Sequence, residues 1–183
     1  LKVNGLNPVK LSLDNYFVNR EDNPLDEHGN YDFEALEAID IDLFNKNMLQ
    51  LLNGEEIEVP KFSFEKGKRY YNGEKLSVKK KDMIIVEGIH GLNPKLSEKI
   101  PEENKYKIYV SALTSVSIDG HNLIKTSDNR LIRRMIRDYR YRGYTSAETI
   151  GRWPSVRRGE EKNIFPYQEE ANIMFNSALL YEL

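Results

Sequence analysis

The sequence contains no cysteine, and among its 183 residues it has three histidines and one tryptophan. The absence of cysteine excludes a disulfide framework and a thiolate metal site. No apolar run approaches the roughly 20 residues that a membrane helix needs. The first residues also lack the basic stretch and apolar run of a signal peptide. We therefore expect a cytoplasmic protein with no membrane partner, whose homo-oligomeric state the sequence leaves open.

The net charge of −2 hides an uneven distribution of charge along the chain. Residues 14–58 carry 13 acids against two bases, whereas residues 125–162 carry 11 bases against five acids. A basic C-terminal third is typical of contact with nucleic acid or a phosphorylated small molecule, although a solvated helix face is the simpler alternative. With 39% hydrophobic and 31% charged residues, the chain can bury the core of one domain, residues 1–183.

Strand and helix patterns alternate along the chain. Residues 8–13 alternate apolar and polar positions, and the continuous apolar run in 82–88 predicts a strand buried on both faces. Residues 106–112 predict another strand. Helical spacing over 34–53 and 128–143 separates them, and strands separated by helices imply an α/β fold with a mostly parallel sheet.

Residues 55–80 interrupt this alternation with a β excursion. Asn72-Gly73 predicts a hairpin turn there. A short helix is expected over 159–171, and the segment "NIMFNS" (172–177) fits either helix or strand by period alone.

The clearest helix, over 128–143, separates apolar from basic side chains. Asp128 is its expected N-cap and Gly143 its expected stop. The two sets lie on opposite sides of the helix: apolar Leu131, Ile132, Met135, Ile136 and Tyr139, and basic Arg130, Arg133, Arg134, Arg137 and Arg140. Arginine forks match phosphate oxygens, so the basic side predicts a phosphate partner.

Two carboxylates follow predicted strands. Asp14 comes after the first strand and Glu87 after "MIIV". Because ligands bind beyond the carboxyl ends of parallel strands, we expect both acids at one crevice, where an acid after an apolar strand can hold Mg²⁺. Carboxylates for Mg²⁺ opposite arginines for phosphate describe phosphoryl transfer. His28, His90 and His121 have no metal-ligand spacing and are interpreted as structural or surface residues.

Several motifs now occur together. In the same order, "SLDNYF", "YDFEALEAID", "PKFSF", "IIVEGIHGL" and "DNRLIRRMIRDYRYRG" resemble segments of the uridine kinase family of P-loop kinases, relatives of phosphoribulokinase. The resemblance covers most of residues 8–180. It implies a P-loop kinase sheet flanked by helices, with the β excursion near the substrate and a basic lid region over 128–165. It also implies that "NIMFNS" is a sheet strand.

The resemblance implies roles on the acceptor side of the site. Asp14 is similar to the base that accepts the proton of a 5′-hydroxyl close to Mg²⁺, and Asp32 to the acid that receives ribose hydroxyls. The remaining expected contacts of the acceptor are Tyr16, Phe62, Arg69 and Arg152, with Tyr16 and Phe17 walling the site against water.

On the phosphate side, Glu87 falls at the Walker B position and shares Mg²⁺ with Asp14. Arg134, Arg137 and Arg142 resemble the residues that hold phosphates through the transition state. Arg133, with Arg134 and Arg137, is expected to contact ATP. The acids and the arginines should then line opposite walls of one cleft.

The sequence also departs from the family. It has no G-x-x-x-x-G-K-[ST] phosphate loop, which we expect shortly before Leu1, so the chain alone should not catalyse. The base-contacting histidine of the family is replaced around Glu65 to Lys68, and Tyr144 stands where the lid usually has arginine.

Three hypotheses therefore remain. The first is ATP-dependent phosphoryl transfer to a nucleoside of the uridine or cytidine kind. The second is transfer to a phosphosugar or a pantothenate-like acceptor. The third is a non-catalytic nucleotide- or RNA-binding module that keeps the kinase fold, with RNA the less favoured partner because tyrosines and arginines are not cleanly interleaved.

Overall fold

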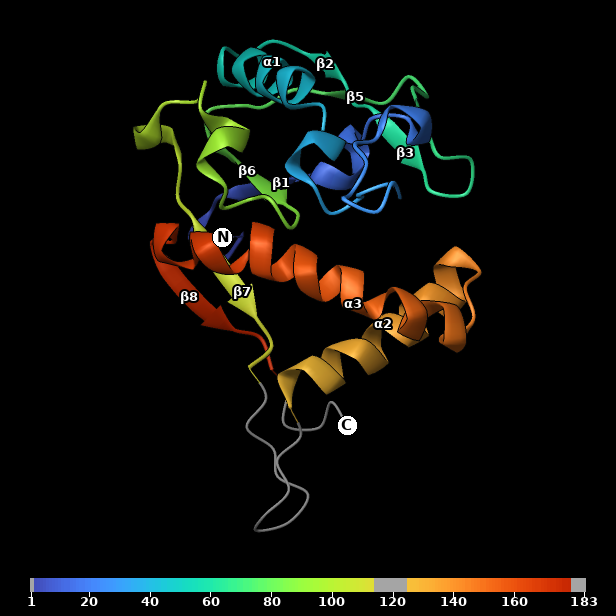
Figure 1. Cartoon of the computed structure of the whole chain (residues 1–183). Helices are drawn as coiled ribbons and strands as arrows, with labels where there is room; N and C mark the ends of the chain where they lie inside the picture. The colour runs from blue at the N-terminus through green and yellow to red at the C-terminus, as the bar shows by residue number, and fades with distance from the viewer. Residues whose placement is uncertain (1, 114–124, 179–183) are drawn as a thin grey trace. The chain divides into compact units, whose positions relative to one another are not determined.

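The computed structural model describes residues 2–113 and 125–178, and Figure 1 shows its helices and strands. The chain forms two compact units, Leu1–Lys105 and Tyr106–Leu183, called here the N-terminal and the C-terminal unit. Among the described residues, no helix is long and apolar enough to cross a membrane. His121 lies outside the described residues.

The N-terminal unit contains one α-helix, six strands and several short 3₁₀ turns among its described residues. Its elements are β1 (Asn7–Ser12), α1 (Ile41–Leu52), β2 (Ile57–Glu58), β3 (Lys61–Ser63), β4 (Lys68–Tyr70), β5 (Lys75–Leu76) and β6 (Asp82–Glu87), with 3₁₀ turns at Lys2–Asn4, Leu13–Tyr16, Arg20–Asp22, Leu36–Ala38, Pro94–Ser97 and Glu102–Asn104.

Strands β1 and β6 lie side by side as a parallel pair (Figure 1). Their register runs from Asn7 opposite Asp82 to Ser12 opposite Glu87, so both strands end at the same edge. The parallel α/β prediction is confirmed. The prediction that residues 82–88 are buried on both faces is wrong, because Met83 and Ile85 are 42% and 39% exposed while the alternate side chains turn inward.

The apolar core of the N-terminal unit lies on the inward face of this pair. Leu11 is 1% exposed, and Ile84 and Val86 of β6 pack against the same cluster. The buried members come from β1 and the turn after it, from α1 and the segment before it, from the β excursion and from the segment after β6: Leu11, Leu13, Tyr16, Leu36, Ile39, Phe44, Met48, Leu51, Ile57, Val59, Leu96 and Ile100.

Helix α1 begins later than the helix predicted over 34–53. Asp40 is its N-cap, and one side-chain oxygen accepts a hydrogen bond from the Leu43 N–H at 3.0 Å. Just before the cap, Ile39 forms an antiparallel bridge with Phe17. Pairing with another segment extends the backbone there, so a helical hydrophobic pattern alone placed the start too early.

The β excursion over 55–80 is present, but its turn is not where the sequence predicted it. Strands β3 and β4 pair antiparallel across the four residues 64–67, and β2 pairs with β5 outside them. Asn72 and Gly73 join β4 to β5, which are not partners, so the predicted hairpin at that dipeptide is wrong.

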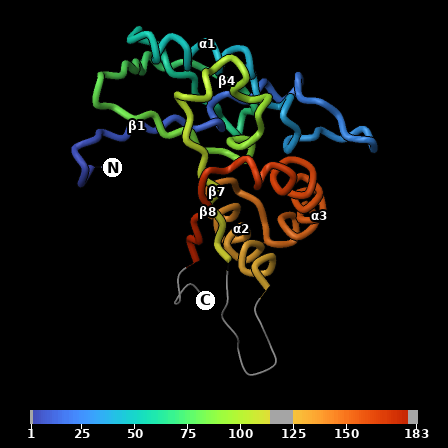
Figure 2. Tube along the Cα trace, turned by 90° about the vertical axis from the view of Figure 1, so that its left-hand side faces the viewer, coloured from blue at the N-terminus to red at the C-terminus, as the bar shows by residue number. Residues whose placement is uncertain are grey.

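The C-terminal unit places two long helices beside a second parallel pair of strands. Its elements are β7 (Ile108–Ser111), α2 (Thr126–Arg142), α3 (Ser146–Asn163), a 3₁₀ helix (Phe165–Glu170) and β8 (Ile173–Asn176). Strands β7 and β8 are parallel, which confirms a strand in "NIMFNS". Figure 2 shows the tube of the chain from the side, with α2 and α3 adjacent to each other.

Helix α3 was missed as a long helix, since only its last residues fell in the short helix predicted over 159–171. Its start is fixed by a capping box, in which Thr145 and Glu148 satisfy each other's backbone N–H groups. Gly151 and Pro154 lower the helical propensity in the middle of this helix, so propensity alone does not predict it.

Helix α2 agrees in extent with the helix predicted over 128–143 and ends at Gly143, whose φ of 70° suits glycine. The predicted cap is wrong, because the N-cap is Lys125 and Asp128 lies in the first turn. The apolar side is also not the buried one: Ile132 and Ile136 are about half exposed, at 49% and 50%. The buried side chains of α2 are polar, Asn129 and Asp138.

Candidate functional site

The two acids predicted at strand ends lie at the same edge of the β1–β6 pair. Ser12 is opposite Glu87, and the exposed Asp14 follows two residues after Ser12, in the turn Leu13–Tyr16. Glu87 is half exposed, and its Oε1 lies 3.4 Å from the Nζ of Lys10. Gly88 packs against Leu13 so closely that a Cβ would lie 2.7 Å from that side chain. This close packing keeps the ends of the two strands together.

Tyr16 is a core residue in this structure. Its side chain is fully buried, its ring meets Phe44 edge to face at 5.4 Å, and its hydroxyl accepts a hydrogen bond from Asn47 at 3.2 Å. Burial raises the pKa of its phenol. It therefore supports the turn that carries Asp14, and its contribution to an acceptor site stays a prediction.

Three phenylalanine rings form a cluster beside this turn. Phe17 lies 5.5 Å from Phe62 and 6.0 Å from Phe64, and the last two rings are 5.3 Å apart, measured between centroids. Phe62 was predicted from the sequence, and Phe64 was not. A signal was present, since Phe62 and Phe64 alternate with polar residues in the sequence, although β3 ends at Ser63 and Phe64 begins the turn after it. Phe64 is 42% exposed, so the cluster offers an aromatic surface to solvent.

Two further predicted acceptor residues have internal partners. An oxygen of Asp32 accepts a hydrogen bond from the Glu34 N–H at 3.1 Å, which orders the loop that carries it. Arg69 donates to Asp40 at 2.8 Å, in an ion pair that is about three quarters buried on both sides. Because Asp40 also caps α1, this pair ties the β3–β4 hairpin to the start of the helix.

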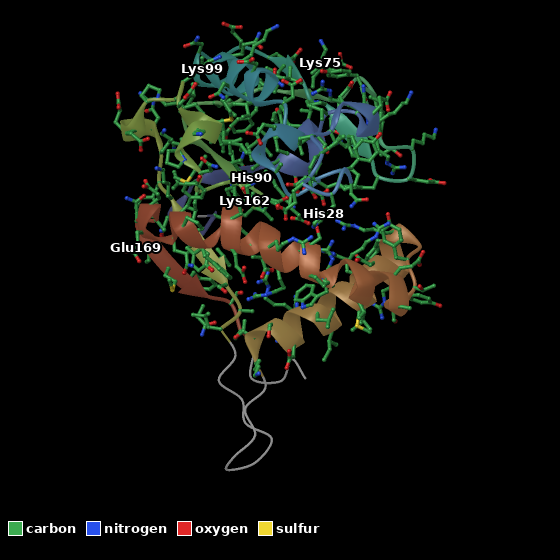
Figure 3. All side chains as sticks on the ribbon, in the orientation of Figure 1. His28, Lys75, His90, Lys99, Lys162 and Glu169 are labelled. Carbon is green, nitrogen blue, oxygen red and sulfur yellow. The ribbon has the colours of Figure 1, made fainter. Side chains whose placement is uncertain are left out.

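His90 was interpreted as an ordinary structural residue, but its surroundings are unusual. It lies on the segment after β6 (labelled in Figure 3) and is 1% exposed. Within the described part of the chain, neither ring nitrogen has a partner at hydrogen-bond geometry. Burial lowers its pKa, while the backbone of Ala35 and the charges of Glu37 and Asp32 oppose that effect. A neutral imidazole is thus buried close to the segment that carries Asp32.

The predicted phosphate-binding arginines belong to the C-terminal unit. Arg134, Arg137 and Arg142 all approach one carboxylate, Asp138, at 3.3, 3.8 and 3.5 Å. Arg133 lies exposed on α2. The five arginines of the basic side therefore do not all face solvent, since carboxylates within the unit compensate part of their charge. Their position opposite Asp14 and Glu87 stays a prediction.

Arg152, predicted to contact the acceptor, stacks on an aromatic ring in the same unit. Its guanidinium carbon lies 4.1 Å from the centroid of Tyr144. A contact of this kind is worth about 0.5–1 kcal/mol at an exposed site. It gives Tyr144, which stands at an arginine position of the family, a structural role beside the start of α3.

Metal binding by protein ligands alone finds little support in the described part of the chain. Within residues 2–113 and 125–178, no three His, Asp or Glu side chains are grouped so that they could hold an ion. Mg²⁺ usually takes only one or two carboxylates and completes its shell with water and phosphate oxygens. Asp14 and Glu87 carry hard oxygen donors of that kind.

The fold resembles that of solved kinase-like structures. A possible uridine kinase from Bacillus stearothermophilus superimposes with a TM-score of 0.54 at 16% identity, over 96% of this chain and 75% of that one. The two chains therefore share an α/β fold with parallel strands and flanking helices.

The model of the phosphoribulokinase / uridine kinase family matches residues 12–180, and the chain belongs to this family. It is 33% identical to a uridine kinase of Bacillus pumilus over 159 residues, which cover 86% of this chain and 66% of the relative. It is 27% identical to a uridine kinase of Halobacterium salinarum over 171 residues, 93% of this chain and 68% of the relative. The chain thus spans about two thirds of the length of these relatives.

Proposed function

We propose that this chain is the acceptor-binding and phosphate-stabilising part of a kinase that transfers the γ-phosphoryl group of ATP to a hydroxyl of a nucleoside-like acceptor. The observation that carries the proposal is the register of β1 and β6, which sets Asp14 and Glu87 at one edge. Membership of the phosphoribulokinase / uridine kinase family supports it.

Each group has a place in this reaction. Asp14 accepts the proton of the attacking hydroxyl, and Asp14 and Glu87 supply carboxylate oxygens to Mg²⁺. Asp32 binds hydroxyls of the sugar, and the cluster of Phe17, Phe62 and Phe64 receives the flat part of the acceptor. Mg²⁺ held by Asp14 and Glu87 would neutralise charge on the phosphates.

The arginines act on the transferred group. Arg134, Arg137 and Arg142 offer donors to phosphate oxygens as charge redistributes in the transition state, and Arg133 contacts ATP. The sequence holds no G-x-x-x-x-G-K-[ST] loop, whose backbone N–H groups bind the phosphates of ATP, and the arginines do not take over that role. We therefore assign turnover to the full-length protein and not to these 183 residues alone.

The test is a screen of the full-length protein, with ATP and Mg²⁺, against nucleosides, phosphosugars and pantothenate-like compounds. The quantity measured is the rate of ADP release. In the variant Asp14→Asn, turnover should fall by about 10²–10⁴-fold, the range of general base catalysis, while circular dichroism stays unchanged. Asp82→Asn is the matched control, since Asp82 lies at the opposite end of β6. Near-normal turnover in Asp14→Asn removes this residue as the base.

The acceptor is the less constrained part of the proposal. Residues Glu65 to Lys68 replace the base-contacting histidine that the resemblance leads us to expect, while the aromatic cluster next to them is partly exposed. A nucleoside whose base stacks on aromatic rings fits this surface better than an aliphatic acceptor. Turnover of a phosphosugar in preference to every nucleoside in the screen contradicts the assignment.

RNA binding remains the second candidate because two tyrosines of α2 are strongly exposed next to arginines. Tyr139 and Tyr141 are 73% and 79% exposed. Stacking of bases on such rings beside guanidiniums is common in RNA binders. If this is the function, affinity for single-stranded RNA should fall steeply between 50 and about 200 mM salt. Affinity that is absent at low salt removes it.

A further inference from the structure

Asp138 occupies a special place in the C-terminal unit. It lies on α2, is 2% exposed, and faces α3, which runs beside α2 (Figure 2). A carboxylate that leaves water loses several kcal/mol of hydration. The partners it meets must therefore be strong, and most of them are arginines.

Three guanidiniums converge on this single carboxylate. The Nε of Arg134 lies 3.3 Å from Oδ2, and the Nη1 of Arg142 lies 3.5 Å from Oδ1. Arg137 approaches Oδ1 at 3.8 Å. Of these three contacts, that of Arg134 has hydrogen-bond geometry, whereas Oδ1 accepts no hydrogen bond from the described residues.

The backbone and side chain of Asp138 also join the two helices. Its carbonyl accepts hydrogen bonds from the N–H groups of Gly143 and Tyr144, which end α2. The buried hydroxyl of Thr149, in the first turns of α3, lies 3.5 Å from Oδ2 and 3.2 Å from the Thr145 carbonyl oxygen, and its single proton can serve one of these acceptors. The carboxylate thus contacts both helices, and Arg134, which donates to it, is held between them.

Glu160 provides an internal comparison. It is the second buried carboxylate between α2 and α3, and its ion pairs are with Arg130 and with Arg157, the latter at 2.6 Å. Neither of these arginines is among those assigned to phosphate. The two acids share burial, chemistry and location, and they differ in the arginines that they hold.

We propose that Asp138 is a positioning residue that orients Arg134 towards the phosphates of the reacting nucleotide. The inference rests on the proposed function, because it assumes that Arg134 binds phosphate. The carboxylate holds one edge of the guanidinium, so the other N–H groups point in a fixed direction. The arginine then need not lose conformational freedom during the reaction. Stability alone explains the arrangement poorly, since buried ion pairs are often replaceable by apolar groups without loss.

The experiment compares Asp138→Asn with the control Glu160→Gln in the full-length protein. With Asp138→Asn, kcat should fall by about tenfold to a hundredfold, as expected when a stabilising group is slightly misplaced, while KM for the acceptor stays the same. Glu160→Gln should leave kcat unchanged. Equal losses of kcat in both variants, or no loss in Asp138→Asn, overturn the proposal.

A second measurement needs neither turnover nor a variant that folds. In the unsubstituted protein, the Nε–Hε NMR signal of Arg134 should exchange slowly with water and show restricted motion, whereas that of the exposed Arg140 should not. Equal mobility of the two overturns the proposal even when turnover is normal. An ordered Arg134 in a protein without kinase activity instead supports the positioning and contradicts the proposed function.

Discussion

At the scale of single residues, the chain buries several polar groups that its composition gave no reason to expect inside. Asp138, Glu160 and His90 are each almost completely buried. The two acids bind arginines, and the imidazole lies beside the segment that carries Asp32. Groups of this kind cluster at functional sites more often than chance allows, because burial tunes charge and orientation.

His90 should make the stability of the protein depend on pH. Burial lowers its pKa in the folded state below the unfolded value of about 6.5, so the unfolded chain binds the proton more readily. Stability is complete above pH 6.5 and falls as the pH drops towards the folded pKa, by at most about 1.4 kcal/mol per pH unit.

Urea unfolding between pH 7.5 and pH 5 measures this effect. The variant His90→Leu should lose less free energy of unfolding across that range than the unsubstituted protein. His28→Gln is the control, since His28 is exposed and on a polar loop. Parallel curves for His90→Leu and the unsubstituted protein would remove His90 as the titrating group.

At the scale of elements, the ends of β1 and β6 depend on a glycine. Gly88 follows β6 with φ at 155°, and a Cβ there would lie 2.7–3.0 Å from the buried side chain of Leu13. Leu13 begins the turn that carries Asp14. The contact therefore links the positions of both predicted magnesium ligands.

Gly88→Ala should lower the free energy of unfolding by about 2–3 kcal/mol, the sum of backbone strain and overpacking. Gly54→Ala is the control for backbone strain alone, because Gly54 has a φ of 77° with nothing within 4 Å of the added Cβ. Chemical denaturation compares the two. A loss in Gly88→Ala no larger than in Gly54→Ala would mean that Leu13 moves aside without cost.

At the scale of the whole molecule, apolar burial is distributed as unevenly as charge. All members of the hydrophobic cluster belong to the N-terminal unit. Among the described residues of the C-terminal unit, Val156 has the one buried apolar side chain. Apart from Gly159, the other buried residues are polar. The two buried acids of these helices, Asp138 and Glu160, each form ion pairs with arginines.

Native-state hydrogen exchange should reveal this difference. Amides of the cluster, such as those of Leu11, Phe44 and Leu51, should exchange near the rate of global unfolding, while amides of α2 and α3 should exchange through local opening. Added salt should accelerate exchange in α2 and α3, because ion pairs are screened. Equal protection in both units would show that apolar burial does not set their stability.

The sequence by itself determined the strands, the extent of α2 and the order of chemical groups. These signals are local: alternating apolar residues, the glycine after Arg142 and the acids after the strands. Local signals can be recognised in the sequence without knowledge of the fold. The resemblance across five motifs added the family. The resemblance led to Phe62, and Phe64 could have been found because the two rings alternate with polar residues.

Only the tertiary structure decided which side of each element is buried. On α2, Ile132 and Ile136 of the apolar side are about half exposed, whereas the side chains of Asn129 and Asp138 are buried. Likewise, β6 buries only one of its two faces, and α1 begins only after the bridge between Ile39 and Phe17. Burial and ion pairing depend on residues distant in sequence, such as Arg130 with Glu160, and no local pattern contains that information.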